Sequence, residues 1–104
     1  TRPLIISAHL DTVFPEKTDL AVNKESGMVR APGIGDNAIG VAALFGILWL
    51  LRERRIELKG DVWLVADVCE EGLGDLRGMK AVVDHFGANV LAYLVEEGMA
   101  LGHI

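Results

Sequence analysis

Six residues of this sequence carry side chains that bind metal ions or move protons, and each stands where an apolar run or a glycine-rich segment ends. They are His9, Asp11, Asp36, Glu70, Glu71 and Glu97. Imidazole nitrogens and carboxylate oxygens are zinc ligands, and a carboxylate that stays uncoordinated can act as a general base or acid. The residue types therefore indicate a metal centre, although each candidate also has a plainer interpretation.

His9 and Asp11 lie at positions i and i+2 of an extended segment, so both side chains point to the same face and Leu10 points to the other. In a metal site, His9 would be a zinc ligand and Asp11 the carboxylate that orients its ring. The plainer interpretation is an ordinary hydrogen-bonded histidine in a turn.

Asp36 follows the glycines at positions 33 and 35 and precedes a predicted helix. One interpretation is a helix N-cap. The other is a carboxylate that bridges two metal ions, because the glycines allow the backbone to turn it inward.

Two acidic pairs follow the later apolar runs. Glu70 and Glu71 are adjacent and cannot face the same way in an extended segment, so one can bind metal while the other serves as general base. Glu96 and Glu97 offer one ligand and one surface charge. Solvated acids in loops are the plainer interpretation of both pairs.

The elements that position these residues follow from hydrophobic periodicity. Three near-continuous apolar runs predict buried strands at Leu4–Ala8, Val62–Ala66 and Val90–Val95. Strands that alternate with helices predict an α/β fold, in which ligand sites gather at the carboxyl ends of the strands. All three predicted strands end in acids, so these side chains should converge at one edge of the sheet.

Two helices are predicted between the strands. The first runs from Asp36-Asn37 to about Arg54 and is apolar on most sides, whereas the second is capped by Asp75 and ends near Phe86. The apolar stripe of the second helix consists of Leu76, Met79, Val82, Val83 and Phe86. The stretch Thr12–Gly35 is predicted as a long loop with at most one weak strand, at Met28–Ala31.

Composition excludes several classes of protein. The chain has 104 residues, 51% of them hydrophobic, with 15 acidic and 10 basic side chains and a single cysteine, Cys69. These values exclude a disordered chain and a disulfide framework, and they argue against nucleic acid as a partner. The longest apolar run, Ile39–Leu51, is too short to cross a membrane, and the lone cysteine favours the reducing cytoplasm. The proposed site contains five acids, which equals the excess of acidic over basic side chains in the whole sequence. They are Asp11, Asp36, Glu70, Glu71 and Glu97.

Three motifs together resemble the dinuclear zinc exopeptidase family, the group of aminoacylases, glutamate carboxypeptidases, tripeptidases and succinyl-diaminopimelate desuccinylases. In order, they are Ser7-Ala8-His9-Leu10-Asp11-Thr12-Val13, then Gly35-Asp36-Asn37, then Glu70-Glu71-Gly72 before Gly74-Asp75. The resemblance implies a three-layer α/β/α catalytic domain with a mixed, mostly parallel central sheet. Residues 1–104 would form part of that domain, without its lid and dimerisation domain or its distal C-terminal part.

The resemblance also implies a role for each candidate and the chemistry of the site. His9, Asp36, Glu71 and Glu97 would bind two divalent metal ions, most often zinc, with cobalt and manganese as substitutes. Asp11 would support His9, and Glu70 would be the general base. The substrate would be a small peptide or an N-acyl amino acid, and the parent protein would be a homodimer formed through its lid domain.

The sequence departs from the family pattern in two respects. Many members have Met-Lys-Gly after the bridging aspartate, where this chain has Asn37-Ala38-Ile39-Gly40. The family also completes its second metal with a distant histidine and carries another histidine on the lid, and neither fits within 104 residues. A truncated or inactive relative with a non-catalytic role is therefore an alternative.

A second alternative is nucleotide binding, because residues 33–38 fit the pattern G-x-G-x-x-A before a helix. No apolar strand precedes Gly33, however, and Asp36 would place a negative charge where a pyrophosphate must bind. The metal site is the preferred interpretation.

Overall fold

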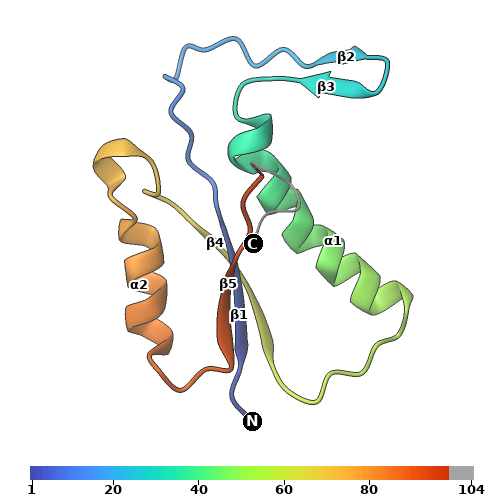
Figure 1. Ribbon diagram of the computed structural model, residues 1–104, viewed down its shortest axis with the longest axis vertical. Helices are drawn as coiled ribbons and strands as arrows, with labels where there is room; N and C mark the ends of the chain where they lie inside the picture. The colour runs from blue at the N-terminus through green and yellow to red at the C-terminus, as the bar shows by residue number, and fades with distance from the viewer. Residues whose placement is uncertain (99–104) are drawn as a thin grey trace.

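Three parallel strands form the centre of the computed structural model, which describes residues 1–98. β1 (Leu4–His9) lies between β4 (Val62–Asp67) and β5 (Ala92–Val95), and the register places His9 beside Asp67 and Ser7 beside Val95. Because all three strands run in the same direction, their carboxyl ends meet at one edge (Figure 1). The predicted strands are confirmed, except that β5 begins at Ala92 rather than at Val90.

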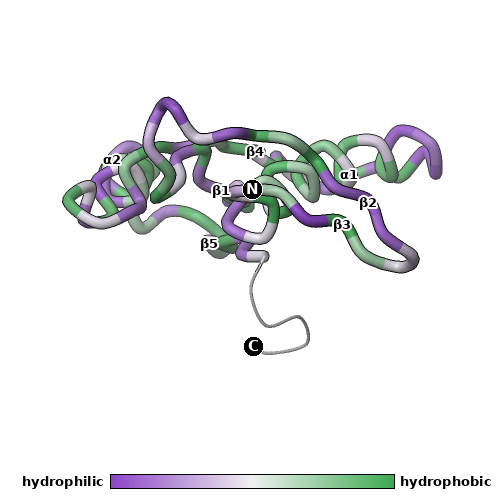
Figure 2. The backbone as a smooth tube through the Cα atoms, turned by 90° about the horizontal axis from the view of Figure 1, so that it is seen from above, coloured by the Kyte–Doolittle hydropathy of each residue, from purple (hydrophilic) through white to green (hydrophobic). Residues whose placement is uncertain are grey.

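One helix covers each face of this sheet. α1 (Ile39–Glu53) and α2 (Arg77–Phe86) lie on opposite sides of the strands, as Figures 1 and 2 both show. Alternate residues of β1 supply the two cores: Ile5 packs with Val82 of α2, and Ile6 packs with Leu44 of α1. The layers are therefore α/β/α, as the sequence predicts.

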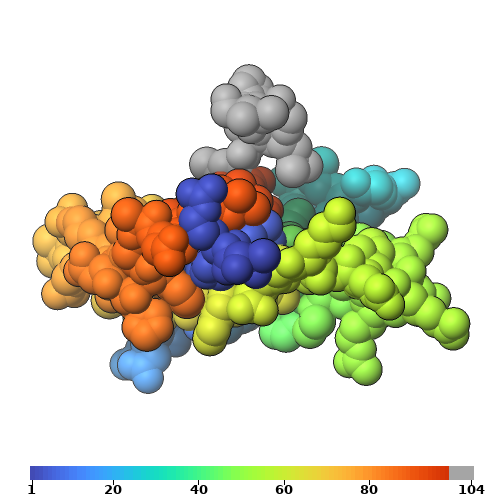
Figure 3. Space-filling view, turned by 90° about the horizontal axis from the view of Figure 1, so that it is seen from below, coloured from blue at the N-terminus to red at the C-terminus, as the bar shows by residue number. Residues whose placement is uncertain are grey.

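The two helices lie at opposite ends of the molecule. Figure 3 shows the side chains of α2 on one side and those of α1 on the other, with the N-terminal residues between them. The order β4-β1-β5 arises because the chain passes through α1 to reach β4 and through α2 to reach β5 on the other side of β1. Such a switch point at the central strand is where ligands bind in open α/β sheets.

The start of α2 differs from the prediction. Asp75 does not cap the helix, because Asp75 and Leu76 both adopt left-handed backbone angles, with φ of 51° and 57°. The Asp75 carboxylate instead accepts a 2.7 Å hydrogen bond from Nζ of Lys80. Along the predicted stripe, Val82 is buried and Met79 is partly buried, whereas Leu76 and Val83 are largely exposed.

The long loop contains a small hairpin that the sequence predicts only in part. β2 (Asn23–Glu25) pairs antiparallel with β3 (Met28–Arg30), and Gly27 supplies the positive φ of 75° that the turn needs. β3 coincides with the predicted weak strand. β2 was not predicted, because a fully exposed polar segment lacks apolar alternation.

The apolar stretch Ile34–Glu53 is longer than the run read from the sequence, although non-helical backbone angles at Asp36 and Asn37 interrupt it before α1. It has 20 residues and contains an 18-residue window with a mean hydropathy of 1.8, so by length and composition alone it could cross a membrane. A core helix passes the same test, and Leu44 of this helix is buried against β1.

Candidate metal centre

His9 ends the central strand, and its ring is almost completely buried, with 2% of the side chain exposed. Nδ1 lies 2.9 Å from the backbone carbonyl oxygen of Asp11, so the tautomer with a proton on Nδ1 donates a hydrogen bond there. Nε2 then presents its lone pair to Asp36, Glu97 and Glu70, whose oxygens lie 3.0, 3.4 and 3.9 Å away. The ring is thus oriented as a metal-binding histidine requires.

Asp36 reaches His9 because the backbone before α1 is not helical. Gly33 adopts a left-handed φ of 70°, Asp36 itself has φ −132° and ψ 95°, and the Asp36–Asn37 peptide is cis. The N-cap interpretation of Asp36 is wrong, since Ala38 occupies the N-cap position of α1 and Asp36 does not cap this helix. Asn37 does so instead, because its Oδ1 accepts the N–H of Gly40 at 3.0 Å.

Asp11 connects the first strand to the acidic pair after β4. Its two carboxylate oxygens accept the backbone N–H groups of Glu70 and Glu71 at 3.2 and 3.1 Å. Oδ1 also lies 3.5 Å from Nδ1 of His9. Asp11 therefore orients the histidine through its backbone carbonyl, not through its carboxylate as its spacing suggests, and the carboxylate fixes the backbone that carries both glutamates.

Glu97 enters the site from the segment that follows β5. The backbone N–H of Glu96 donates to the carbonyl of Ser7 at 2.8 Å, which extends the pairing with β1 by one residue. Glu97 is the next residue, and its Oε1 lies 3.4 Å from Nε2 of His9. All six predicted residues are thus brought to the carboxyl edge of the sheet.

Three atoms at this edge are buried and have no hydrogen-bond partner among the described residues. They are Nε2 of His9, Oδ1 of Asp36 and Oε1 of Glu71. One ligand atom from each of these residues lies within 4.8 Å of the others. Nε2 of His9 and Oδ1 of Asp36 lie 3.0 Å apart and form an ion pair only when the ring is doubly protonated. Buried polar atoms are normally paired, so with a neutral His9 these three convergent acceptors of zinc-ligand type fit a cation.

The electrostatics of the cluster agree with this fit. Burial lowers the pKa of His9, but Glu97, the Asp11 carbonyl, Glu70 and Asp36 raise it, and the net pKa lies above its ordinary value. Burial and the neighbouring acids Asp36 and Glu70 raise the pKa of Glu71. Burial likewise raises the pKa of Glu97, although His9 opposes this. Carboxylates gathered this closely repel one another, and a divalent cation offsets that repulsion.

Two further polar residues belong to the site region and were not predicted for it. Asp67 lines a cavity of about 300 Å³ together with His9, Glu70 and Glu97, and burial raises its pKa. Its position at a strand end, beside His9 in register, was the available signal. Asn37 is 1% exposed, and nothing in its sequence context indicates that burial.

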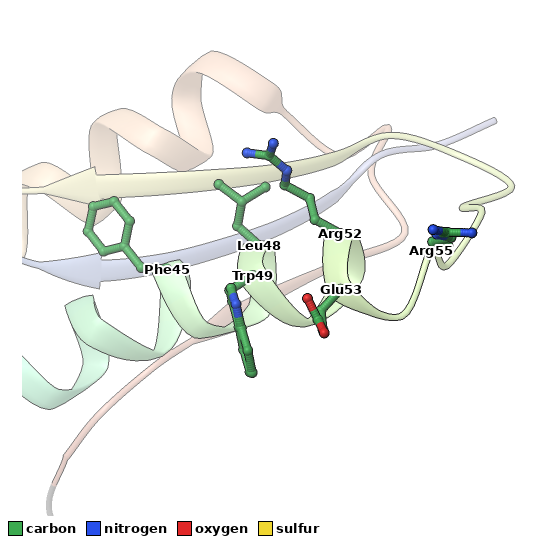
Figure 4. A pocket seen from close by; sticks show the side chains of 6 residues that line it. All are labelled: Phe45, Leu48, Trp49, Arg52, Glu53 and Arg55. Atoms are coloured by element: carbon green, nitrogen blue, oxygen red, sulfur yellow. The ribbon is translucent and has the colours of Figure 1, made fainter.

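A larger hollow lies away from these acids, on the outer surface of α1. It measures about 580 Å³ and is lined by Phe45, Leu48, Trp49, Arg52, Glu53 and Arg55 (Figure 4). Arg52 projects on one side of the helix and Trp49 on the other. None of the six candidate residues lines it, so size alone does not locate the chemistry.

Comparison with known proteins agrees with the geometry. Residues 5–104 match the sequence model of peptidase family M20/M25/M40. No curated protein shows a significant match to the chain. Members of the matched family are metal-dependent peptidases and hydrolases that bind divalent ions. Since the match covers nearly every residue, the chain belongs to peptidase family M20/M25/M40.

Proposed function

We propose that this chain forms the metal centre of a hydrolase that cleaves the amide bond of a small peptide or an N-acyl amino acid. The observation that supports this most directly is the convergence of three unpaired acceptors, on His9, Asp36 and Glu71, at the carboxyl edge of the sheet. They come from three separate segments, and in each the side chain is held toward the same point.

His9, Asp36 and Glu97 would hold one divalent ion, and Asp36 and Glu71 would contribute to a second, with zinc as the natural metal and cobalt or manganese as substitutes. Asp36 is the residue suited to bridging, because its Oδ1 faces Nε2 of His9 and it also shares the cluster with Glu71. When bound, such ions supply a water of lowered pKa and polarise the carbonyl of the substrate.

Glu70 is proposed as the general base. Its carboxylate lies at the edge of the cluster, 3.9 Å from His9 Nε2, and it is about one-third exposed. It can therefore accept a proton from water and return that proton to the departing amine. Asp11 fixes the Glu70 backbone and so sets where this carboxylate stands.

The wider setting is proposed from the sequence. The substrate and the ions would be the only ligands, with neither nucleic acid nor membrane as a partner. The lone Cys69 and the acidic composition support a cytoplasmic enzyme. A distant part of the protein would supply the histidine that completes the second metal, and a lid domain would supply a substrate-binding histidine and a dimer contact.

Two measurements test the proposal. Isothermal titration of the metal-free full-length protein should show binding of zinc, cobalt and manganese, and the loaded full-length protein should hydrolyse dipeptides or N-acyl amino acids, whereas residues 1–104 by themselves should bind these metals weakly and hydrolyse amides negligibly. Glu57→Gln, which alters an exposed acid after α1, serves as the charge-matched control and should change neither result. Metal binding without hydrolysis of any amide would favour the non-catalytic alternative, and absence of metal binding would refute the proposed site.

A further inference from the structure

Asn37 is the most deeply buried polar residue next to the cluster, and the proposed mechanism does not use it. The residue is 1% exposed, and both the nitrogen and the oxygen of its side-chain amide have a hydrogen-bond partner. Nδ2 donates to the backbone carbonyl of Glu96 at 2.7 Å, and Oδ1 accepts the backbone N–H of Gly40 at 3.0 Å. One side chain thus connects the start of α1 to the segment after β5.

Both connected segments carry a predicted metal ligand in the adjacent position. Asn37 follows Asp36, and Glu96 precedes Glu97, although 59 residues separate Asn37 from Glu96 in the sequence. The two carboxylates lie 3.0 and 3.4 Å from the same atom, Nε2 of His9. Any change in the spacing of the two segments would therefore change the spacing of the two ligands.

Glycines let these segments approach closely. A Cβ atom at Gly40 would overlap Oδ1 of Asn37 and the carbonyl oxygen of Glu96. A Cβ atom at Gly98 would overlap the carbonyl oxygen of Gly35. The first turn of α1 and the segment after β5 are thus pressed together around the Asn37 amide.

A helix-capping role alone does not explain this arrangement. Capping needs only an acceptor for an N–H of the first turn, which Oδ1 provides to Gly40. The donation from Nδ2 to Glu96 is additional, and an aspartate cap could not make it, because an ionised carboxylate has no donor.

We propose that Asn37 is a positioning residue that holds Asp36 and Glu97 at the separation in which they bind one cation together with His9. This inference rests on the proposed metal site. It adds a residue that touches neither metal nor substrate and acts only through the two ligands beside it.

The decisive variant is Asn37→Asp, which keeps the acceptor for Gly40 and replaces the donor to Glu96 with an oxygen that repels the carbonyl. We expect zinc affinity to fall about 10- to 100-fold, the usual effect of losing an outer-shell partner. A fall in zinc affinity would distinguish lost positioning from simple electrostatics, because the added negative charge alone would strengthen the binding of a cation. Asn89→Asp, an exposed position near the start of β5, introduces the same charge as a control and should leave affinity unchanged.

The visible absorption spectrum of the cobalt-loaded protein separates positioning from general destabilisation. A misplaced ligand alters the spectrum of the folded protein, whereas simple loss of stability lowers the melting temperature and leaves the spectrum as it was. We expect an altered spectrum for Asn37→Asp. A folded Asn37→Asp protein with the zinc affinity and cobalt spectrum of the unaltered protein would overturn the inference.

A measurement on the unaltered protein applies even if the variant does not fold. The side-chain NH₂ of Asn37 should exchange with solvent far more slowly than that of Asn89, and NMR should detect coupling across its hydrogen bond to the Glu96 carbonyl. Rapid exchange at Asn37 would overturn the inference. If the unaltered protein binds zinc but Asn37→Asp binds it equally well, only this inference fails, whereas failure of the unaltered protein to bind any of the three metals removes the proposed function as well.

Discussion

Oδ2 of Asp11 accepts the backbone N–H of Glu71 at 3.1 Å, and this bond ties the end of the central strand to the acidic pair after β4. The backbone N–H of Glu70 donates a second hydrogen bond to Oδ1 of Asp11, so both oxygens of the carboxylate are used. Two residues that are 60 positions apart in the sequence are therefore fixed relative to one another before any ligand binds. The predictions below begin with this pair.

Asp11→Ala should destabilise the metal-free protein by about 1–3 kcal/mol, because it leaves two partly buried N–H groups without acceptors. Burial raises the pKa of Asp11, but the N–H groups of Glu71 and Glu70 lower it, and the net pKa lies below its ordinary value. A lowered pKa means that Asp11 stabilises the fold above its unfolded-state pKa and that this contribution disappears as pH falls through the folded-state pKa. Urea unfolding at pH 7 and near pH 3 should show a larger difference between Asp11→Ala and the unaltered protein at the higher pH. Asp84→Ala, on the exposed face of α2, is the matched control.

Asp36→Ala and Glu70→Ala should separate ligand from base. Asp36→Ala should lose bound metal, because Asp36 is the carboxylate that shares one cluster with both His9 and Glu71. Glu70→Ala should keep its metal and lose about 10²- to 10⁴-fold in turnover, the typical contribution of general base catalysis. Elemental analysis of the purified variants, together with kcat, measures both effects. An equal loss of metal in the two variants would contradict the assignment.

Glu97→Gln should weaken zinc binding at least about tenfold, whereas Glu96→Gln should not. Oε1 of Glu97 lies 3.4 Å from Nε2 of His9, while the structure gives Glu96 a role only through its backbone. Titration calorimetry on the two neighbouring substitutions compares the same change of charge one residue apart. The reverse order of effects would show that Glu96 is the ligand.

Zinc affinity should rise with pH and level off above the raised pKa of His9. The acids Glu97, Glu70 and Asp36 hold a proton on the ring to higher pH, although burial opposes them, and zinc must displace that proton. Without metal the sign reverses, because protonated His9 stabilises the fold below its unfolded-state pKa and this contribution is lost as pH rises through the folded-state pKa. Calorimetry in buffers of different ionisation enthalpy measures the released proton. A proton release that does not change between pH 5.5 and 8 would contradict the prediction.

Leu44→Ala should cost about 2–5 kcal/mol of unfolding free energy, because Leu44 is 5% exposed and fills the core between α1 and β1. Its neighbour Phe45 is 69% exposed, so Phe45→Ala should change stability far less. Chemical denaturation of both variants tests whether α1 packs on the sheet in solution. Equal effects at the two positions would indicate that the helix is oriented differently.

Local sequence patterns located the central strands and the candidate residues. Apolar runs placed β1 and β4 to within one residue, strand ends identified His9 and Glu71, and the glycine-rich segment before a helix identified Asp36. These signals are readable because strand burial and helix periodicity are local properties, recorded in the spacing of neighbouring side chains.

Only the tertiary structure decided how the candidates meet. The order β4-β1-β5 puts His9 between the segments that carry Glu71 and Glu97, and the non-helical turn at Asp36 directs that carboxylate to His9 instead of to the helix. No local sequence pattern indicates the role of Asn37, because its burial depends on a hydrogen bond to Glu96, 59 residues away. Contacts of that kind arise from strand order and close backbone approach, which no local pattern records, since the same residues could occupy the same elements in a different strand order.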